Sequence, residues 1–285
     1  MIVFPDCKIN LGLRILNKRE DGFHNLATVF YPLPLREALE IIRNNDQDNK
    51  EAIHFTQSGN IVDGNAENNL CVKAYHLLKK DFPQLPAVSM HLHKVIPMGA
   101  GLGGGSADAA FTLKLLNEKF QLSLSTEQLI HYSLQLGSDC PFFIVNQPCY
   151  ATGRGEIMEP VNLSLSGYEL LLINPGIHVN TGWAFSQLNI SPFVSENNSI
   201  INQKKLQEII HQHPSSWRKE LLNDFEIPVF LKYPELSAIK AQLYQQGAIY
   251  AAMSGSGSSL FGLFEKGKSA ALSLPPHYYA KLLPL

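Results

Sequence analysis

Alternating apolar and polar residues at the start of the chain predict a strand. The stretch MIVFPDCKINLGLRIL follows this two-residue period over residues 1–16. AVSMHLHKVIP repeats the pattern and predicts a strand from Val88 to Ile96, which runs into a proline. Between them, apolar residues at positions 70, 74, 77 and 78 follow the 3.6-residue period and predict a helix. REALEIIRN, at residues 36–44, fits a strand or a helix, and a strand is favoured because a polar loop follows it closely.

The rest of the chain alternates between helical patterns and short apolar runs. SADAAFTLKLLNEKF and STEQLIHYSLQLG predict two consecutive helices, and YELLLINPG predicts a buried strand that ends in a turn. AIYAAMSGSGSSLFGLFE predicts a strand, a glycine loop and a second strand. NTGWAFSQL, at residues 180–188, predicts the start of a helix or a turn, and helical patterns occur at residues 204–212, 216–222 and 234–246. The Ser/Asn-rich residues 189–203 predict an exposed loop, and a helix and a strand are expected at the C-terminal end. A change of pattern near residue 155 predicts two domains, at residues 1–155 and 156–285.

Five glycines fall within seven positions of PMGAGLGGGSADAA, residues 97–110. Glycine loses more backbone freedom on folding than other residues, so such a run indicates a close approach to the main chain or positive φ angles. The helix predicted after it leaves its first N–H groups unpaired at the positive end of the helix dipole, where an anion can bind. We therefore expect Ser106 either to cap the helix or to reach a phosphate or its metal. The phosphate cradle is expected to comprise Pro97, Met98, Gly99, Ala100, Gly101, Leu102, Gly103, Gly104, Gly105 and Ser106.

Other glycine-rich phosphate-binding motifs fit this segment less well. A P-loop requires a lysine after its last glycine, whereas Gly105 follows Gly104. The dinucleotide-binding pattern is formally met by Gly99, Gly101 and Gly104, but it requires a strand after the helix, and a second helix is predicted there. The glycine loop of protein kinases joins two strands, and this one opens a helix. A purely structural turn remains the alternative to a phosphate cradle.

Composition and charge narrow the class of protein further. The 285 residues are 45% hydrophobic and 17% charged, as in a soluble globular protein with a sizeable core. The formal net charge is −2, and no basic cluster large enough to bind nucleic acid stands out. The N-terminus lacks the pattern of a signal peptide, and no stretch approaches the length of a membrane span. Four cysteines without CxxC spacing indicate reduced thiols, so a cytoplasmic protein is expected.

Four stretches, in order along the chain, resemble the GHMP small-molecule kinases. CKINLGLRILNKREDGFHNLATVF resembles the first motif of that family, PMGAGLGGGSADAA the second and MSGSGSSLFGLF the third, while LGSDCPFF resembles its Gly-Ala-Asp-x-Pro segment. The departures at Cys7, Phe23 and Ser138 remove no group that the chemistry needs. The resemblance implies an α+β, two-domain GHMP kinase fold. Its N-terminal domain is expected to be ribosomal-protein-S5-domain-2-like and its C-terminal domain ferredoxin-like, with the active site in the interdomain cleft.

The same resemblance implies an ATP-dependent kinase whose acceptor alcohol carries a cytidine diphosphate. Asp139 then corresponds to the catalytic aspartate of the family, which orients the hydroxyl and accepts its proton. Lys8 corresponds to the motif lysine, which stabilises charge on the transferred phosphoryl group. Lys8 lies within an apolar strand pattern, where a charge is costly unless it is paired. An ordinary salt bridge is the alternative for these two residues.

The resemblance also implies a binding site for the acceptor. Asn10 lies two residues from the motif lysine, on the same strand face, and is expected to hydrogen-bond the acceptor or its diphosphate. Phe23 is expected to stack on the cytosine ring and His24 to hydrogen-bond its edge. Phe185 corresponds to a second aromatic wall, with Thr181 nearby. A core position is the alternative for Phe185.

On the nucleotide side, the resemblance points to Asn69 and Lys94 as residues that contact ATP. A solvated strand lysine is the alternative for Lys94. Mg²⁺ is expected to bridge the phosphates, with Ser106 as the best candidate for a protein ligand. His91 and His93 are expected to be structural or exposed.

Three other functions stay open: another kinase of this family that acts on homoserine or mevalonate, a non-catalytic nucleotide-binding module, and an NAD-dependent oxidoreductase. The expected partner is a small molecule, not nucleic acid or a membrane. The chain is expected to be a monomer or a weak homodimer.

Overall fold

The computed structural model describes residues 1–44, 52–60, 65–188, 206–269 and 273–285, and the chain forms two compact units. The first unit comprises Met1–Cys7, Leu35–Met98 and Gly103–Asn146, and the second comprises Lys8–Pro34, Gly99–Leu102 and Gln147–Leu285. Neither unit is continuous in sequence, because strands β2 (Asp6–Lys18) and β3 (His24–Arg36) each contribute residues to both. The domain boundary expected near residue 155 stays a prediction.

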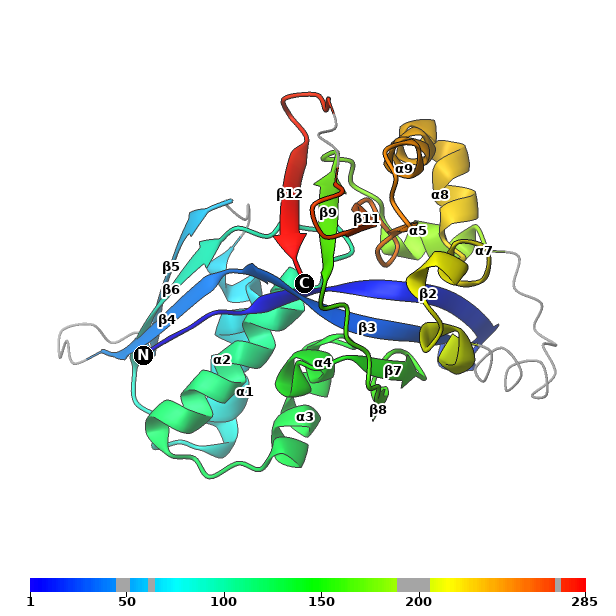
Figure 1. The fold of residues 1–285 in the computed structure, drawn as a ribbon. Coiled ribbons are helices and arrows are strands. Elements are labelled where there is room, and N and C mark those ends of the chain that lie inside the picture. Colours follow the sequence, from blue (N-terminus) through cyan, green and yellow to red (C-terminus); the bar gives the residue numbers. More distant parts are fainter. Residues whose placement is uncertain (45–51, 61–64, 189–205, 270–272) are drawn as a thin grey trace. The chain divides into compact units, whose positions relative to one another are not determined.

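A four-stranded sheet forms one layer of the first unit (Figure 1). Its strand order is β1 (Ile2–Val3), β4 (Ala38–Arg43), β6 (Val88–Lys94) and β5 (Ile53–Gly59). Strand β5 runs parallel to β6, and the other pairs are antiparallel. The strands predicted at residues 36–44 and 88–96 are confirmed. The strand predicted over residues 1–16 divides into β1 and β2 around Pro5, which has no N–H group for a strand ladder.

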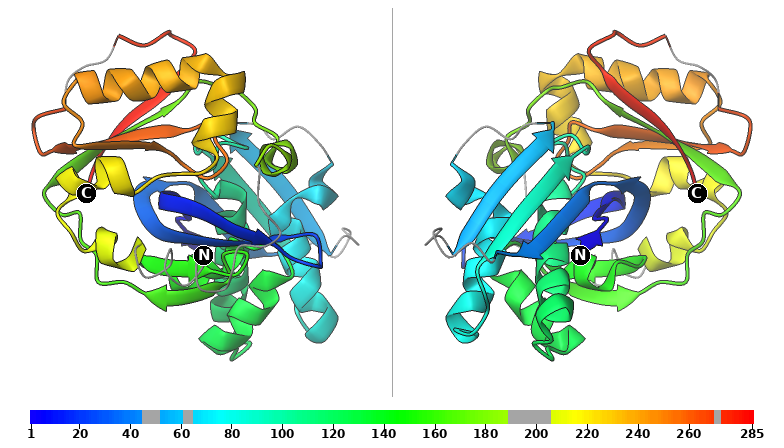
Figure 2. Two further views of the ribbon diagram at one scale, coloured as in Figure 1. Left: turned by 90° about the vertical axis from the view of Figure 1, so that its right-hand side faces the viewer. Right: turned by 90° about the vertical axis from the view of Figure 1, so that its left-hand side faces the viewer.

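Helices α1 (Leu70–Asp81) and α2 (Gly104–Phe120) lie side by side along one face of this sheet (Figures 1 and 2). A short 3₁₀ helix, η1 (Ala66–Asn68), precedes α1, and α3 (Thr126–Leu134) and α4 (Cys140–Val145) follow α2. Helix α3 begins as predicted, with a capping box between Ser125 and Gln128. No strand separates α2 from α3 in this described stretch, so the βαβ unit required for a dinucleotide-binding site is not formed.

Helix α2 begins at Gly104 rather than at Ser106. Gly103 is its N-cap residue, in a left-handed conformation with φ of +71°, and no side chain caps the helix. The capping role expected for Ser106 is therefore wrong, because Ser106 already lies within the first turn. A glycine at the cap provides positive φ without the steric cost of a Cβ atom.

The second unit contains two four-stranded sheets. One has the order β2, β3, β7 (Cys149–Thr152) and β8 (Ile157–Pro160). The other is antiparallel throughout, in the order β10 (Tyr250–Met253), β11 (Leu260–Glu265), β9 (Tyr168–Asn174) and β12 (Tyr279–Pro284). The strands predicted for YELLLINPG and on both sides of the glycine loop in AIYAAMSGSGSSLFGLFE are confirmed.

Some helices of the second unit follow the predicted patterns, whereas η2 (Pro214–Ser216) and α8 (Glu226–Lys232) were not predicted. Helix α9 (Pro234–Gln245) lies along β10 and β11 and buries Leu236, Ile239 and Leu243 against them (Figure 2). The pattern over residues 204–212 is confirmed for the described residues 206–210, whereas the predicted loop at residues 189–203 lies outside the description. In the described residues after Glu265, β12 forms but the expected helix does not. The other helices are α5 (Thr181–Ser186) and α7 (Trp217–Glu220).

All four cysteines are buried and carry free thiols, in agreement with the prediction of reduced cysteines. Burial raises the pKa of Cys140 and of Cys149 to about 12, so neither thiol ionises near neutral pH. Over the described ranges of the chain, no helix is both long enough and apolar enough to span a membrane.

Candidate active site

Lys8 and Asn10 lie on one face of β2, and the side chain of each is buried, with 3% of the residue exposed. Lys8 Nζ donates a hydrogen bond of 2.6 Å to Asn10 Oδ1, and Asn10 Nδ2 donates one of 3.0 Å to Thr28 Oγ1 on β3. The Thr28 hydroxyl in turn donates to the carbonyl of Gly12 at 2.5 Å. Lys8 Nζ also lies 4.8 Å from the centre of the Phe30 ring. The predicted shared face is confirmed, and this relay orients the Asn10 amide with its oxygen toward the ammonium group.

In residues 99–103 of the glycine segment, glycines with positive φ angles alternate with buried apolar residues. Gly99, Gly101 and Gly103 have positive φ angles of 60°, 77° and 71°. Between them, Ala100 and Leu102 are buried, with 3% and 1% of each residue exposed. The two apolar side chains hold the segment in place, while the glycines allow backbone conformations that L-residues rarely adopt.

Gly101 is required by a close approach of the chain to itself. A Cβ atom at this position would lie 2.0 Å from the carbonyl oxygen of Ser254, in the loop between β10 and β11. Ser254 Oγ also donates a hydrogen bond of 2.7 Å to the Gly101 carbonyl. The backbone N–H of Lys8 donates to the Leu102 carbonyl at 2.9 Å. Residues 99–102 are therefore held both by the third glycine-rich stretch, residues 253–264, and by the strand that carries Lys8.

The first turn of α2 carries backbone N–H groups that have no acceptor. Among the described residues, no group accepts a hydrogen bond from the backbone N–H of Gly104, Gly105 or Ser106. The first bonded amide is that of Ala107, which donates to the Gly103 carbonyl at 2.9 Å. Three consecutive unpaired donors at the positive end of a 17-residue helix are suited to binding an anion, and the binding of a phosphate there stays a prediction.

The loop that carries Asp139 passes beside this first turn. A Cβ atom at Gly137 would lie 3.9 Å from Ser106 Oγ and 3.3 Å from Cys140 Sγ. The backbone N–H of Cys140 donates to the Gly137 carbonyl at 3.2 Å and closes a tight turn around Asp139. Asp139 is the N-cap residue of α4, but its side chain makes no capping hydrogen bond. The first unit therefore brings the hydroxyl of Ser106 close to the turn that bears Asp139.

Lys94 forms a buried ionic cluster with two carboxyl groups near the first turn of α2. Lys94 Nζ lies 2.7 Å from Glu37 Oε2 and 2.8 Å from Asp108 Oδ2, and the exposed fractions of the Lys94, Glu37 and Asp108 side chains are 3%, 0% and 4%. Glu37 Oε1 also accepts a hydrogen bond from the Ile96 N–H at 3.1 Å. A Cβ atom at Gly104 would lie 3.5 Å from Lys94 Nζ. The alternative of a solvated strand lysine is therefore wrong, and the direct contact with ATP stays a prediction.

The protonation of this cluster is set by two acids that share one ammonium group. Burial and the neighbouring Glu37 carboxyl raise the pKa of Asp108 well above its ordinary value, although the Lys94 charge opposes the rise. Burial favours a lower pKa for Lys94, but the charges and hydrogen bonds of Asp108 and Glu37 outweigh it and raise the pKa. Asp108 Oδ1 is buried and has no hydrogen-bond partner in the described structure. A protonated Asp108 leaves a neutral Lys94–Glu37 pair.

The predicted aromatic residues gather in the second unit. The rings of His24 and Phe185 are stacked, with centroids 4.6 Å apart and planes 12° apart. Phe225 packs edge-on against Phe185, with centroids 4.8 Å apart. Phe23 is 49% exposed, and the guanidinium group of Arg154 lies 4.2 Å from its ring centre. Burial, followed by the charge of Lys18, lowers the pKa of His24, so the imidazole is neutral at pH 7 and has one donor and one acceptor nitrogen.

Two other predicted binding residues lie at helix starts. Asn69 is the N-cap residue of α1, and its Oδ1 accepts a hydrogen bond of 2.9 Å from the Cys71 N–H. Thr181 is the first residue of α5, and its hydroxyl lies 2.9 Å from the hydroxyl of Ser256 in the third glycine-rich stretch. Each of these residues thus has a local structural role. Their contacts with ATP and with the acceptor stay predictions.

The sequence reasoning missed three residues of these clusters. Asp108 is a single charged residue within the small apolar run of the second motif, a signal of a buried charge that needs a partner. Glu37 lies next to the apolar run of β4 and offers a weaker signal of the same kind. Arg154 follows a glycine in a turn, and nothing in its surroundings along the chain indicates that it covers Phe23.

Comparison with known proteins identifies the family of the chain. Residues 69–147 match the GHMP kinases N terminal domain and residues 202–276 match the GHMP kinases C terminal domain, so the chain is a member of the GHMP kinase family. A 4-diphosphocytidyl-2-C-methyl-D-erythritol kinase of Bacteroides fragilis is 56% identical over 264 residues, which are 93% of this chain and 92% of that protein. The predicted resemblance is confirmed.

Solved structures agree on the fold. A crystal structure of 4-(cytidine 5'-diphospho)-2C-methyl-D-erythritol kinase matches with a TM-score of 0.75 at 27% identity, over 100% of this chain and 99% of that chain. The mevalonate kinase of Methanococcus jannaschii matches with a TM-score of 0.68 over 94% and 92% of the two chains. Its identity is 13%, so this likeness shows the shared fold alone. The predicted α+β GHMP kinase fold is confirmed.

Proposed function

We propose that this kinase transfers the terminal phosphoryl group of ATP to the 2-hydroxyl of 4-diphosphocytidyl-2-C-methyl-D-erythritol, a step in the non-mevalonate synthesis of isoprenoid precursors. The observation that carries the acceptor is the identity of 56% across nearly the whole length of a relative named for that substrate. A mevalonate kinase shares the fold at an identity of 13%, which shows the fold alone and does not support mevalonate as the acceptor.

The first turn of α2 supports binding of the triphosphate. Its unpaired N–H groups at Gly104, Gly105 and Ser106 supply donors for phosphate oxygens, and the absence of side chains at the two glycines lets the phosphates approach the main chain. We propose that this segment aligns the terminal phosphate for transfer. Phosphoryl transfer depends mainly on such positioning and on stabilisation of the charge on the transferred group.

Asp139 and Lys8 are proposed as the catalytic residues. Asp139 lies on a tight turn beside Ser106, and its side chain is not used to cap α4. It orients the acceptor hydroxyl and takes its proton as the bond to phosphorus forms, because a tertiary alcohol is too weak an acid to ionise first. Lys8 is buried in a polar relay that fixes its ammonium group. It stabilises the negative charge of the transferred group.

The stacked rings in the second unit support recognition of the cytidine. Phe185 is held by Phe225 and stacks with His24, so a flat aromatic platform exists beside a neutral imidazole. A cytosine that stacks on such rings gains roughly 1–3 kcal/mol. Phe23 is exposed and offers a further ring, held by Arg154. We propose that Thr181 and Asn10 hydrogen-bond the sugar or diphosphate part of the acceptor.

Mg²⁺ is proposed to accompany ATP. Within the described parts of the chain, no group of three or more acidic, histidine or cysteine side chains can enclose a metal ion. We propose that phosphate oxygens and water hold most of the coordination of Mg²⁺, with Ser106 as one protein ligand, since Mg²⁺ in kinase sites usually keeps several waters. The ion would neutralise phosphate charge. The four free thiols support an enzyme of the reducing cytoplasm.

Turnover of defined acceptors tests the proposal. The purified chain is incubated with ATP and Mg²⁺ and with each of three acceptors: the cytidine-bearing substrate, mevalonate and homoserine. We expect release of ADP with the first acceptor only. Asp139→Asn is expected to lower kcat at least about 100-fold, because it removes the proton acceptor but keeps the shape of the side chain.

Asp81→Asn is the matched control, since Asp81 accepts a hydrogen bond from Tyr132 on the surface of the same unit. Its kcat is expected to equal that of the unmodified chain. A preference for mevalonate or homoserine would contradict the proposed acceptor, and full turnover by Asp139→Asn would contradict the role of Asp139.

A further inference from the structure

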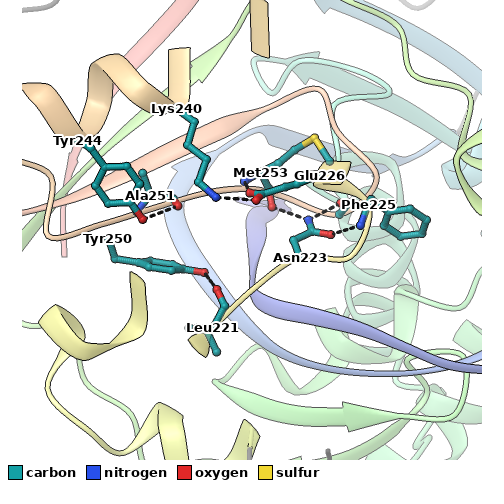
Figure 3. A network of polar contacts seen from close by, with 10 residues as sticks. Leu221, Asn223, Phe225, Glu226, Lys240, Tyr244, Tyr250, Ala251 and Met253 are labelled. Carbon is teal, nitrogen blue, oxygen red and sulfur yellow. Dashed lines mark hydrogen bonds and ion pairs between the residues drawn. The ribbon is translucent and has the colours of Figure 1, made fainter. Parts of the chain in front are cut away.

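Asn223 is a buried residue that the catalytic proposal does not use. It is 3% exposed, and its side chain bonds only to backbone groups of its own unit in the described structure. Nδ2 donates two hydrogen bonds of 2.8 Å, to the carbonyls of Met253 and Gly255 (Figure 3). Oδ1 accepts one of 3.0 Å from the Phe225 N–H. Both donor hydrogens and the acceptor oxygen of the amide are thus satisfied.

The segment around Asn223 is joined to β2, the strand that carries Lys8. The Leu13 N–H donates to the Leu222 carbonyl at 2.9 Å, and the Asp224 N–H donates to the Leu13 carbonyl at 2.9 Å. Asp224 reinforces this short parallel contact through its carboxylate, which accepts from the Ile15 N–H at 2.8 Å and pairs with Arg14 at 2.9 Å. The hydrogen bonds of Leu222 and Asp224 to Leu13 therefore fix the backbone of Asn223 relative to β2.

Glu226 also binds Met253, the first residue of the third glycine-rich stretch. Its Oε1 accepts from the Met253 N–H at 2.8 Å, and its Oε2 is paired with Lys240 Nζ at 2.5 Å (Figure 3). The N–H and the carbonyl of Met253 are therefore bound by two different side chains, Glu226 and Asn223. Because the N–H and the carbonyl of Met253 are both hydrogen-bonded, the backbone is held in one conformation where the loop at residues 254–257 begins.

The loop and the nearby Ser259 contact residues 100 and 101 of the glycine segment. Ser254 Oγ donates to the Gly101 carbonyl at 2.7 Å, and the Ser259 N–H donates to the Ala100 carbonyl at 3.1 Å. The contact is tight, because a Cβ atom at Gly101 would lie 2.0 Å from the Ser254 carbonyl oxygen. A small displacement of the loop would therefore displace residues 99–102 as well.

We infer that Asn223 is a positioning residue for the phosphate-binding segment, which acts through the loop at residues 254–257. Its neighbours Leu222 and Asp224 bind the strand of Lys8, its side chain binds the loop, and the loop contacts residues 99–102. This inference rests on the proposed function, because it assigns Asn223 to the binding of the phosphates of ATP. The loop transmits the position of β2 to the glycine segment, so that the segment is shaped before ATP binds.

Asn223→Asp tests the inference with almost no change in shape. The carboxylate still accepts from Phe225, but one oxygen replaces the NH2 group, which donated to both the Met253 and the Gly255 carbonyls. We expect the Kd and KM for ATP to rise about 10-fold or more, since the loss of two hydrogen bonds corresponds to about one decade. The KM for the cytidine-bearing acceptor is expected to change less than twofold. Amide hydrogen exchange at residues 99–102 is expected to accelerate.

Asn117→Asp is the matched control. Asn117 also bonds the backbone through both of its amide atoms, to the N–H and the carbonyl of Leu124, at the end of α2 away from its first turn. If the two variants lose the same thermal stability and show the same Kd for ATP, Asn223 is only structural and the inference is wrong. Ser254→Ala serves if Asn223→Asp does not fold, because it cuts the bond to Gly101 with a minimal change. An unchanged Kd for ATP in Ser254→Ala then overturns the inference.

The Kd for ATP is measured without any acceptor, so the two proposals fail separately. If the unmodified chain binds ATP but does not phosphorylate the cytidine-bearing acceptor, the proposed function is wrong and the comparison of Asn223→Asp with Asn117→Asp still decides the inference. If the unmodified chain turns over and the two variants bind ATP equally well, only the inference is wrong.

Discussion

The buried cluster of Lys94, Glu37 and Asp108 allows a quantitative prediction for Lys94→Met. Methionine preserves most of the volume of the lysine side chain but removes the charge that both carboxylates share. One buried carboxyl then takes up a proton. For a carboxyl with an ordinary pKa near 4, holding the proton at pH 7 costs about 4 kcal/mol, because each pH unit corresponds to about 1.4 kcal/mol. This value lies within the range of about 3–5 kcal/mol for breaking a buried ion pair.

The sign of the pH dependence follows from the same reasoning. At pH 5 the cost of protonation falls to about 1.4 kcal/mol, so the destabilisation by Lys94→Met shrinks as the pH falls. In the unmodified chain, the raised pKa of Asp108 means that the folded state binds a proton more tightly than the unfolded state. Its contribution to stability is therefore fully present below the ordinary pKa of aspartate, and it is lost as the pH rises through the raised value.

Urea unfolding at pH 5 and pH 7 measures these differences. Lys114→Met is the control, because Lys114 is a half-buried lysine of α2 whose Nζ bonds to the Ile144 carbonyl rather than to a carboxylate. Adding Asp108→Asn to Lys94→Met is expected to recover part of the loss, since it removes one of the two acids. A loss below about 1 kcal/mol at pH 7, or an equal loss at both pH values, would show that Lys94 does not neutralise a buried carboxylate.

Two further predictions concern the loops and the acceptor. Gly101→Ala is expected to abolish measurable ATP binding in a titration, because its Cβ would meet the Ser254 carbonyl at 2.0 Å, and ATP binding equal to that of the unmodified chain would contradict the close approach. Phe185→Leu is expected to raise the KM for the cytidine-bearing acceptor about 10-fold without changing the KM for ATP, through the loss of stacking. In an NMR titration, His24 is expected to have a pKa below that of free histidine, so its neutral form persists to lower pH, and a value above 6.5 would show that the imidazole is not desolvated.

Local patterns along the chain were sufficient for most of the secondary structure. The alternation over residues 88–96 and the 3.6-residue period over α1 each predict one element, because burial of one face imposes these periods whatever the partner is. Two predictions were wrong, and each error has its cause within a few residues along the chain. The start of α2 was misplaced because a left-handed glycine took the cap position expected for Ser106, and Pro5 divided one predicted strand into two.

Within the candidate site, the chemical groups can be predicted from neighbouring residues, whereas the partner that each group contacts depends on how distant elements pack. The glycine run with its unpaired helix start, and the spacing of Lys8 and Asn10 on one strand face, follow from neighbours in the chain. The partners of Lys94 lie 57 and 14 residues away, and the bonds of Asn223 to Met253 and Gly255 span 30 and 32 residues. No local period encodes such contacts, since they depend on how separate elements pack, and only the folded chain shows that a buried charge or amide has found its partners.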